Sequence, residues 1–347
     1  MSHRVAVDAM GGDHGSAVVV PASVEASRRF GIGVTLVGRA SEIEALLGST
    51  DVSGADITVV DAADTIDMDE HPATAARKKP ASSIAVALNE VKEGRAAAML
   101  SAGNSGAVMA VALMRLGRLP GVDRPAIAST LPSIRSRTLV LDLGAVTDPR
   151  PHHLVEFAWM GQVYAERVLG IPNPLIGLLS NGEEPGKGNQ FVQQVHPLLV
   201  AETGLRFHGN VEGKDVPLGT VDVVVTDGFT GNVALKVAEG VASLTTHMIR
   251  EELTRTWPRK IAALALRPAF RAVRSRLDYS EIGGAPLLGI NGNVIIAHGK
   301  SDEKAITNAI GVAATAADQD LAGAIEATMR KRSDTKREAT VSPPASD

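Results

Sequence analysis

Short apolar runs alternate with longer stretches of helical periodicity along most of the chain. The runs are rich in Val, Ile and Leu and lead into glycine or polar residues: "RVAVDAM" (4–10), "VTLVG" (34–38), "ITVVDA" (57–62), "AAMLSAG" (97–103), "LVLDLGA" (139–145), "LIGLLSNG" (175–182), "VDVVVTDG" (221–228) and "VIIAHG" (294–299). Unbroken apolar runs of this length are typical of strands buried on both faces of a sheet. Buried helix segments are the alternative, but the short runs and their glycine flanks favour strands.

This alternation predicts an α/β fold with a mostly parallel, doubly wound sheet in a three-layer αβα arrangement. Helices are expected after Asn104–Ser105 and after Ser301–Asp302, where a capping residue precedes apolar periodicity. We expect one large α/β domain over residues 1–328. Residues 329–347 are charged and then rich in Pro and Ser, which predicts a disordered tail.

Four of the predicted strands lead into glycine-rich loops: "DAMGGDHG" (8–15), "SAGNSG" (101–106), "SNGEEPGKGN" (180–189) and "TDGFTGN" (226–232). Glycine lets backbone N–H groups turn toward a ligand, and a following helix N-terminus adds donors and partial positive charge. The alternative for any one loop is an ordinary turn and helix cap. Together they predict an anion site at the carboxyl ends of the strands, for which the candidates are Asp8, Gly11, Gly12, Asp13, Ser101, Gly103, Asn104, Ser105, Gly228, Thr230 and Gly231.

The common nucleotide-binding motifs do not fit these loops. "GEEPGKGN" has one residue too few between its glycines for a P-loop, and Gly188 stands where Ser or Thr is needed. "GKGNQF" lacks the last glycine of the dinucleotide fingerprint. The sequence therefore disfavours an NTPase and a simple Rossmann dehydrogenase.

Four polar side chains beside the loops are candidates for catalysis: Lys187, Asn232, Asp227 and His14. A lysine on a glycine-flanked loop suits a phosphate or a developing oxyanion, although a solvated surface lysine is the alternative. Asn232, like Asn104, suits a donor to an anion and a helix cap equally well, and Asp227 suits orienting a lysine, accepting ligand hydroxyls or capping a helix. His14, like His298, suits a proton donor, whereas a lone histidine is more often structural. No spacing of Asp and His specifies a metal site, so we expect no metal and no cofactor.

Composition narrows the class of protein. Of the 347 residues 44% are hydrophobic and 21% charged, as in ordinary globular proteins, and the net charge of −4 gives no sign of nucleic-acid binding. Without cysteine, disulfides, thiolate metal ligands and an acyl-cysteine intermediate are excluded. No signal-peptide pattern and no membrane-spanning run is apparent, so the cytoplasm is the expected location.

One segment departs from this acidic balance. Between residues 248 and 278 basic and apolar side chains interleave, and residues 250–276 hold eight Lys or Arg against Glu251 and Glu252. We expect two short amphipathic helices separated at Pro268. Such a pair suits an anionic membrane surface or an acidic carrier protein, and a helical hairpin at a dimer interface is the alternative.

The ordered set of motifs resembles the phosphate acyltransferase family of bacterial phospholipid synthesis, PlsX, up to about residue 325. The similar segments, in order, are "VAVDAMGGDHG", "ARKKPASSIAVALNEVKEGRAAAMLSAGNSGAV", "NGEEPGKGN", "GNVEGKD", "DGFTGNVALK", "GGAPLLG" and "AHGKSDEKAI". Two departures are Val146, where the family has Asn, and Ser180–Asn181, where it has Asn–Ile. Val146 and Asn181 are therefore poor anchors for a transferred role.

The resemblance implies a fold similar to phosphate acetyltransferase and isopropylmalate dehydrogenase, and a homodimer. It implies transfer of a fatty acyl group from acyl-[acyl carrier protein] to inorganic phosphate. The acyl phosphate would then serve a membrane glycerol-3-phosphate acyltransferase. Two other readings are a β-decarboxylating dehydrogenase of related fold and a non-catalytic carrier-binding or membrane scaffold protein.

For this reaction we expect phosphate on the backbone donors of residues 101–105 and 228–232, attacking the thioester directly. Asn232 and Lys187 would stabilise the oxyanion, and His14 would protonate the leaving sulfur. Acylation of Ser101 or Ser105 is the alternative that the missing cysteine leaves open.

Overall fold

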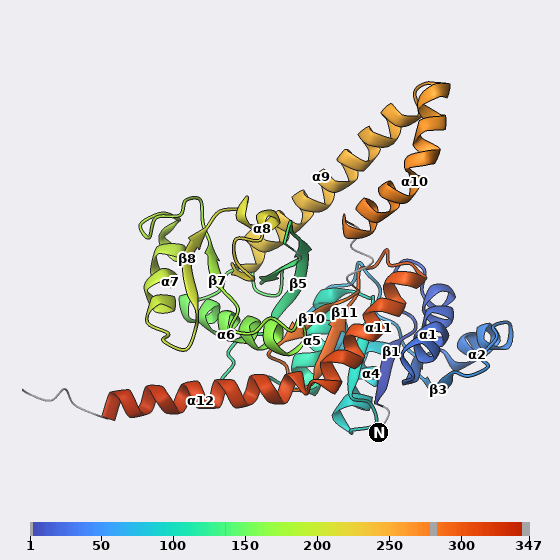
Figure 1. Cartoon of the computed structure of the whole chain (residues 1–347). Coiled ribbons are helices and arrows are strands. Elements are labelled where there is room, and N and C mark those ends of the chain that lie inside the picture. Colours follow the sequence, from blue (N-terminus) through green and yellow to red (C-terminus); the bar gives the residue numbers. More distant parts are fainter. Residues whose placement is uncertain (1–2, 136, 278–282, 342–347) are drawn as a thin grey trace, which may run out of the picture.

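Eleven strands form one continuous sheet in the computed structural model, which describes residues 3–135, 137–277 and 283–341 (Figure 1). The strand order is β3-β2-β1-β4-β11-β10-β5-β6-β9-β7-β8. The strands are β1 (Arg4–Asp8), β2 (Gly33–Gly38), β3 (Asp56–Asp61), β4 (Ala98–Ser101), β5 (Ala126–Pro132), β6 (Arg137–Leu141), β7 (Ile176–Leu179), β8 (Phe207–Val211), β9 (Val223–Val225), β10 (Ala285–Leu288) and β11 (Asn293–Ile296). All eight apolar runs contribute strands, so the predicted α/β class is confirmed.

Helices cover both faces of this sheet. They are α1 (Ser16–Phe30), α2 (Ala40–Gly48), α3 (Pro72–Lys78), α4 (Ser83–Lys92), α5 (Ser105–Arg115), α6 (Pro151–Arg167), α7 (Gln190–Val200), α8 (Asp215–Leu218), α9 (Gly228–Thr254), α10 (Trp257–Leu277), α11 (Glu303–Asp318) and α12 (Leu321–Val341). Side chains of α1 and α11, and of α6 and α12, pack on one face, while α4, α5 and the start of α9 pack on the other. The three layers are those expected from the sequence.

The sheet consists of two parallel groups that run in opposite directions. Strands β1, β2, β3, β4 and β11 are parallel, as are β6, β7, β8 and β9. Three antiparallel pairings lie between the groups, β11 with β10, β10 with β5, and β5 with β6. An odd number of reversals makes the groups opposed. The sequence predicted that the loops gather at one edge of a parallel sheet. This prediction is wrong, because the two groups of strands end at their loops from opposite directions.

The register of the central strands brings the loops together instead. Ser101 and Ile296, the last residues of β4 and β11, are paired, and Ile296 also faces Ala285 at the start of β10. Two residues further along β10, Leu287 pairs with Ile127 of β5. The next residue of β5, Ala128, pairs with Leu141 at the end of β6. At about 3.3 Å per residue, the carboxyl ends of the two groups stop within one or two residues of the same level. The loops after them consequently meet from opposite sides.

Helices α9 and α10 form a hairpin that projects from the body (Figure 1). The expected break at Pro268 is wrong, because α10 continues through that residue. The helices separate at residues 255–256, and Pro258 occupies the first turn of α10, where its missing N–H costs nothing and its fixed φ suits a helix start. The hairpin is also longer than the predicted segment, since α9 begins at Gly228; residue 278 lies outside the described residues.

The expected disorder from residue 329 is not observed over residues 329–341, which continue α12. Met329 is buried, and Arg332 forms a 2.9 Å salt bridge with the buried Glu202. Glu326 and Arg330 add an ion pair one turn apart on the same helix. Charged residues of good helical propensity thus extend a helix that the body anchors. Residues 342–347 lie outside the described part of the chain.

Candidate active site

The first two glycine loops interlock around the carboxylate of Asp8. Ser101 donates its hydroxyl hydrogen to Asp8 at 2.6 Å and accepts the N–H of Gly103 at 3.0 Å, while the N–H of Met10 also reaches Asp8 at 3.1 Å. A side chain on Gly11 would lie 2.6 Å from the backbone nitrogen of Gly103. The close approach of the two loops therefore requires glycine at this position.

Asp8 and Ser101 are buried under the two glycine loops that they connect. Both are buried, and burial raises the pKa of Asp8 although the Ser101 hydroxyl bond opposes this shift. Their hydrogen bonds are used within the loops. Asp8 and Ser101 therefore hold the loops in position, and their contact with phosphate stays a prediction; Gly12 and the exposed Asp13 lie nearer the surface.

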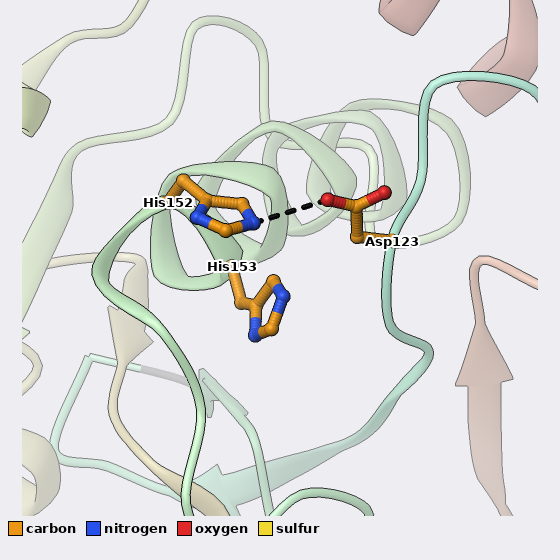
Figure 2. Close-up of side chains that lie close together, drawn as sticks. All are labelled: Asp123, His152 and His153. Atoms are coloured by element: carbon orange, nitrogen blue, oxygen red, sulfur yellow. Dashed lines mark hydrogen bonds and ion pairs between the residues drawn. The ribbon is translucent and has the colours of Figure 1, made fainter.

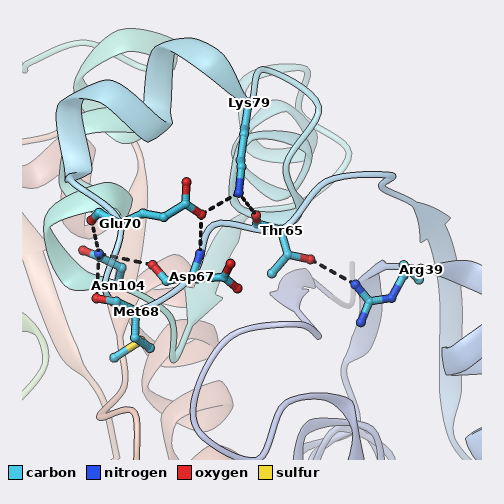
Figure 3. Close-up of polar contacts among 7 residues, drawn as sticks. All are labelled: Arg39, Thr65, Asp67, Met68, Glu70, Lys79 and Asn104. Atoms are coloured by element: carbon cyan, nitrogen blue, oxygen red, sulfur yellow. Dashed lines mark hydrogen bonds and ion pairs between the residues drawn. The ribbon is translucent and has the colours of Figure 1, made fainter.

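The side chain of Asn104 caps helix α5 and also holds a neighbouring loop. Its side-chain oxygen accepts the N–H of Ala107 at 3.1 Å and caps α5. Its amide nitrogen donates to the backbone carbonyls of Met68 and Glu70 at 3.1 and 3.0 Å, which fixes the loop over residues 65–71 (Figure 3). Lys79 holds the same loop by donating to the carbonyl of Thr65 at 2.7 Å. The Asn104 amide is thus committed to protein carbonyls; the exposed Ser105 begins α5.

A second buried carboxylate, Asp142, organises the loop after β6. It accepts four backbone N–H groups, those of Ile127, Gly144, Ala145 and Val146, at 2.7–3.1 Å. Burial raises the pKa of Asp142 against the effect of these bonds. Asp142 therefore fixes the loop after β6 in the second group by accepting hydrogen bonds, as Asp8 fixes the loops after β1 and β4 in the first group.

The start of α9 packs directly on this loop. The N–H of Gly228 donates to the carbonyl of Val146 at 2.9 Å, and a Cβ on Gly231 would overlap the carbonyl oxygen of Asp142. The Asn232 side chain lies beside Gly144. Asp227 caps the helix by accepting the N–H of Thr230 at 2.8 Å. Asn232 is exposed and thus keeps its side chain at the surface of the site.

The two groups of loops meet through His298, which follows β11. The N–H of Asp13 donates to the carbonyl of Gly299 at 2.8 Å, so this loop belongs to the first group. Across from it, Lys236 and Glu239 of α9 lie close enough to His298 to influence its titration. Burial, reinforced by Lys236, lowers the pKa of His298. The ring is therefore neutral at neutral pH.

The structure does not join every predicted residue to this centre. The hydrogen bond described for Lys187 runs from its backbone N–H to Glu184 in its own loop, at 2.9 Å, and its side chain is exposed beside Gly182. His14 is exposed on the first loop. Among the described residues, no hydrogen bond or ion pair joins Lys187 to the loops of residues 101–105 or 228–232. Both residues stay predictions.

Lys236 is a residue that sequence reasoning missed. It lies one turn after Asn232 on α9 and pairs with Glu239 at 2.9 Å. Residues three or four apart share a helix face, so Asn232 and Lys236 within "DGFTGNVALK", followed by Glu239, were a signal present in the sequence. Nothing in the sequence indicated that this face is directed at His298.

Asp123, His152 and His153 form a separate cluster (Figure 2). His152 contacts Asp123 at 3.0 Å, and the Nδ1 atom of the buried His153 accepts the N–H of Arg150 at 3.0 Å. This bond places the hydrogen of the neutral His153 ring on Nε2. Burial lowers the pKa of His153 to about 4. A ring that carries hydrogen on Nε2 is a donor, so this cluster is better suited to a structural role than to holding a metal ion.

Two opposed loop groups with backbone donors can hold a tetrahedral anion, and comparison with known proteins identifies the family of the chain. A sequence model of a family described as "Fatty acid synthesis protein" matches residues 3–323. The phosphate acyltransferase of Desulfitobacterium hafniense (strain DSM 10664 / DCB-2) is 49% identical over 311 residues, covering 89% of this chain and 92% of the relative. That of Geobacter sulfurreducens is 49% identical over 307 residues, covering 88% of each chain. This chain belongs to the phosphate acyltransferase family.

Solved structures of other proteins share the fold of this chain. A phosphotransacetylase from Streptococcus pyogenes superimposes with a TM-score of 0.64 at 17% identity, covering 91% of this chain and 94% of that one. The EutD phosphotransacetylase from Staphylococcus aureus gives 0.63 at 14% identity with the same coverage. The three-layer fold predicted from the resemblance is confirmed.

Membership also confirms the predicted enzyme class and activity, acyl transfer to phosphate in fatty acid and phospholipid synthesis. The dehydrogenase and scaffold readings are not favoured. Within the described residues, no helix is both apolar and long enough to cross a bilayer.

Proposed function

We propose that this acyltransferase moves a fatty acyl group from acyl-[acyl carrier protein] directly to inorganic phosphate. The observation that carries the proposal is the meeting of two opposed sets of glycine loops, each organised by a buried aspartate, Asp8 or Asp142. Backbone N–H groups and the starts of α5 and α9 supply donors to a phosphate held between them. The geometry favours placement of a ready nucleophile over activation of a weak one.

The transfer needs few proton movements. A phosphate oxygen forms a bond to the thioester carbonyl carbon, the carbonyl becomes a tetrahedral oxyanion, and collapse breaks the C–S bond to release the carrier's thiolate. A thiol with pKa of about 8.5 is a fair leaving group, so the thiolate takes its proton after departure. Because the pKa of His298 is lowered, its ring is neutral at neutral pH; it suits a hydrogen-bond donor to phosphate and holds no extra proton to give to the leaving sulfur. His14, exposed on the adjacent loop, remains our proposed proton source for the sulfur.

Asn232 is the proposed donor to the oxyanion, with a lysine supplying charge. Lys236 lies on the same helix face as Asn232, and Lys187, on the exposed loop of residues 180–189, is the second candidate. A buried Ser101 that donates to Asp8 argues against acylation of that hydroxyl. Parallel double-reciprocal lines in two-substrate kinetics would overturn direct attack in favour of an acyl-serine.

Release of free thiol from long-chain acyl-[acyl carrier protein] tests the function. We expect release to require phosphate and to yield one acyl phosphate, trapped with hydroxylamine, per thiol. Tight carrier binding with no phosphate-dependent release would contradict the proposal.

We propose a homodimer that uses α9. Six apolar side chains recur at intervals of three or four along this helix and are all exposed: Phe229, Val233, Val237, Val241, Leu244 and Met248. Such a stripe is the pattern of a helix-packing seam, and its length suits the same stripe of a second copy. Val241→Glu is expected to shift the protein from dimer to monomer in sedimentation velocity. Ser243→Glu, exposed on another face of α9, should leave the dimer intact; dimeric Val241→Glu would exclude this interface.

We further propose that α10 holds the enzyme at the inner face of the cell membrane, near a glycerol-3-phosphate acyltransferase that uses its product. Trp257, Ile261 and Leu264 are exposed beside Arg267 and Arg271. Basic amphipathic helices bind anionic lipid surfaces. Arg274 and Arg276 lie outside the described side chains.

Reversing both Arg267 and Arg271 to Glu is expected to reduce binding to vesicles containing phosphatidylglycerol by at least about tenfold, since each basic residue contributes about 1 kcal/mol. Lys92→Glu with Arg167→Glu is the charge-matched control on other helices. If vesicle flotation is unchanged while affinity for the acyl carrier falls, the segment is a carrier-docking site and not a membrane anchor.

A further inference from the structure

A cavity of about 450 Å³ lies where the two parallel groups of the sheet meet. It is bounded by the end of α1, by α6 and α11, and by the central strands β5, β6 and β10. We call it the seam pocket. Its volume falls within the range of sites for small organic ligands. None of the glycine loops contributes to its lining, so it is separate from the transfer site.

Tyr164 provides a polar group directed into this pocket. Its side chain belongs to α6, lines the seam pocket and is 5% exposed. No hydrogen bond of its hydroxyl to another described residue is found, and buried tyrosine hydroxyls normally have a partner. Burial raises the pKa of Tyr164 to about 12, so the hydroxyl remains a donor. A ligand oxygen is a suitable acceptor.

Two arginines give the same wall a positive charge. Arg137 of β6 lies near the Tyr164 hydroxyl, and Arg29, at the end of α1, donates to the side chain of Asn308 at 3.3 Å. The one carboxylate in the lining, Asp318, lies 3.5 Å from His3. Two guanidinium groups and one hydroxyl against a single carboxylate favour an anionic head group.

Apolar side chains make up much of the remaining lining, beside Ser129, Thr130, Asn308 and Thr315. Ile32, Val168, Leu169, Pro286 and Val312 contribute to it. Burying apolar surface on such a wall stabilises a hydrocarbon chain by roughly 25 cal/mol per Å². The pocket thus joins a cationic, hydrogen-bonding end to an apolar side.

We propose that the seam pocket binds a single-chain amphipathic anion, a fatty acid or a long-chain acyl or alkyl phosphate, outside the transfer site. The head group contacts Arg137 and the Tyr164 hydroxyl, and the chain lies along the apolar lining. Because α1 and α11, which cover the first group of strands, line the pocket together with α6 and β6 from the second side, an occupant contacts elements of both sides at once. Binding therefore stabilises the folded chain as a whole.

Calorimetric titration of the full chain tests the proposal with four probes below their aggregation limits. Dodecanoate and dodecyl phosphate carry both features, whereas dodecanol lacks the charge and inorganic phosphate lacks the chain. We expect saturable binding of the first two in the presence of excess inorganic phosphate, which occupies the transfer site. Dodecanol should bind at least about tenfold more weakly, because the charged hydrogen bonds are lost.

Three variants locate the binding. Arg137→Gln is expected to weaken dodecanoate and dodecyl phosphate about tenfold, and the conservative Tyr164→Phe several-fold, each with unchanged thermal unfolding of the unliganded protein. Arg167→Gln, on the exposed last turn of α6, is the matched control and should bind normally. Two results would each overturn the proposal: equal affinity in the Arg137 and Tyr164 variants, or loss of binding when phosphate is added, which assigns the amphiphile to the transfer site.

Discussion

Gly231→Ala is expected to lower phosphate-dependent thiol release about 100-fold and the free energy of unfolding by about 1–3 kcal/mol. A Cβ at this position overlaps the carbonyl oxygen of Asp142 and lies 3.0 Å from its carbonyl carbon. Neither backbone can yield easily, because four N–H groups hold the Asp142 carboxylate. The start of α9 must therefore shift, and Asn232 and Lys236 move with it.

Gly240→Ala is the control within the same helix. Nothing lies within 4 Å of a Cβ built on Gly240, and alanine in an exposed helix interior is favoured over glycine by about 1 kcal/mol. We expect full activity and equal or greater stability, measured by urea unfolding alongside the thiol assay. Normal activity in Gly231→Ala would show that the packing of α9 on the Asp142 loop does not position the site.

Asn232→Ala is expected to reduce kcat by about 10²- to 10³-fold with little change in stability. Removing one preorganised donor to an oxyanion has an effect of this size. The side chain is exposed and rests beside Gly144, so its loss leaves no buried gap. Asn291→Ala, exposed in the turn between β10 and β11, is the control for removal of a surface amide.

Comparing Lys236→Ala with Lys187→Ala in the same assay identifies the lysine that supplies charge. The position of Lys236 opposite His298 predicts the larger loss of kcat for Lys236→Ala. An effect confined to Lys187→Ala would instead show that its loop closes over phosphate. For Asn232→Ala, an unchanged kcat would show that the Asn232 side chain does not act in the transfer step.

Local features of the sequence were sufficient to predict much of the fold and the positions of the glycine loops. Apolar runs buried on both faces predict strands because a central strand needs no polar face, and the glycines that follow them predict close backbone approaches, as found at Gly11 and Gly231. The capping roles of Asp227 and Asn104 follow from the same local chemistry. The ordered motifs also determined the family.

Tertiary structure alone decided how these pieces face one another. Strand direction depends on pairings between residues far apart in the chain, so three antiparallel contacts reversed one half of the sheet and made its loops oppose the others. The same long-range geometry brought Lys236 to His298, left Lys187 within its own loop, and anchored α12 through Arg332 and Glu202. A sequence pattern records what each residue needs locally; which distant partner meets that need is settled only when the whole chain packs.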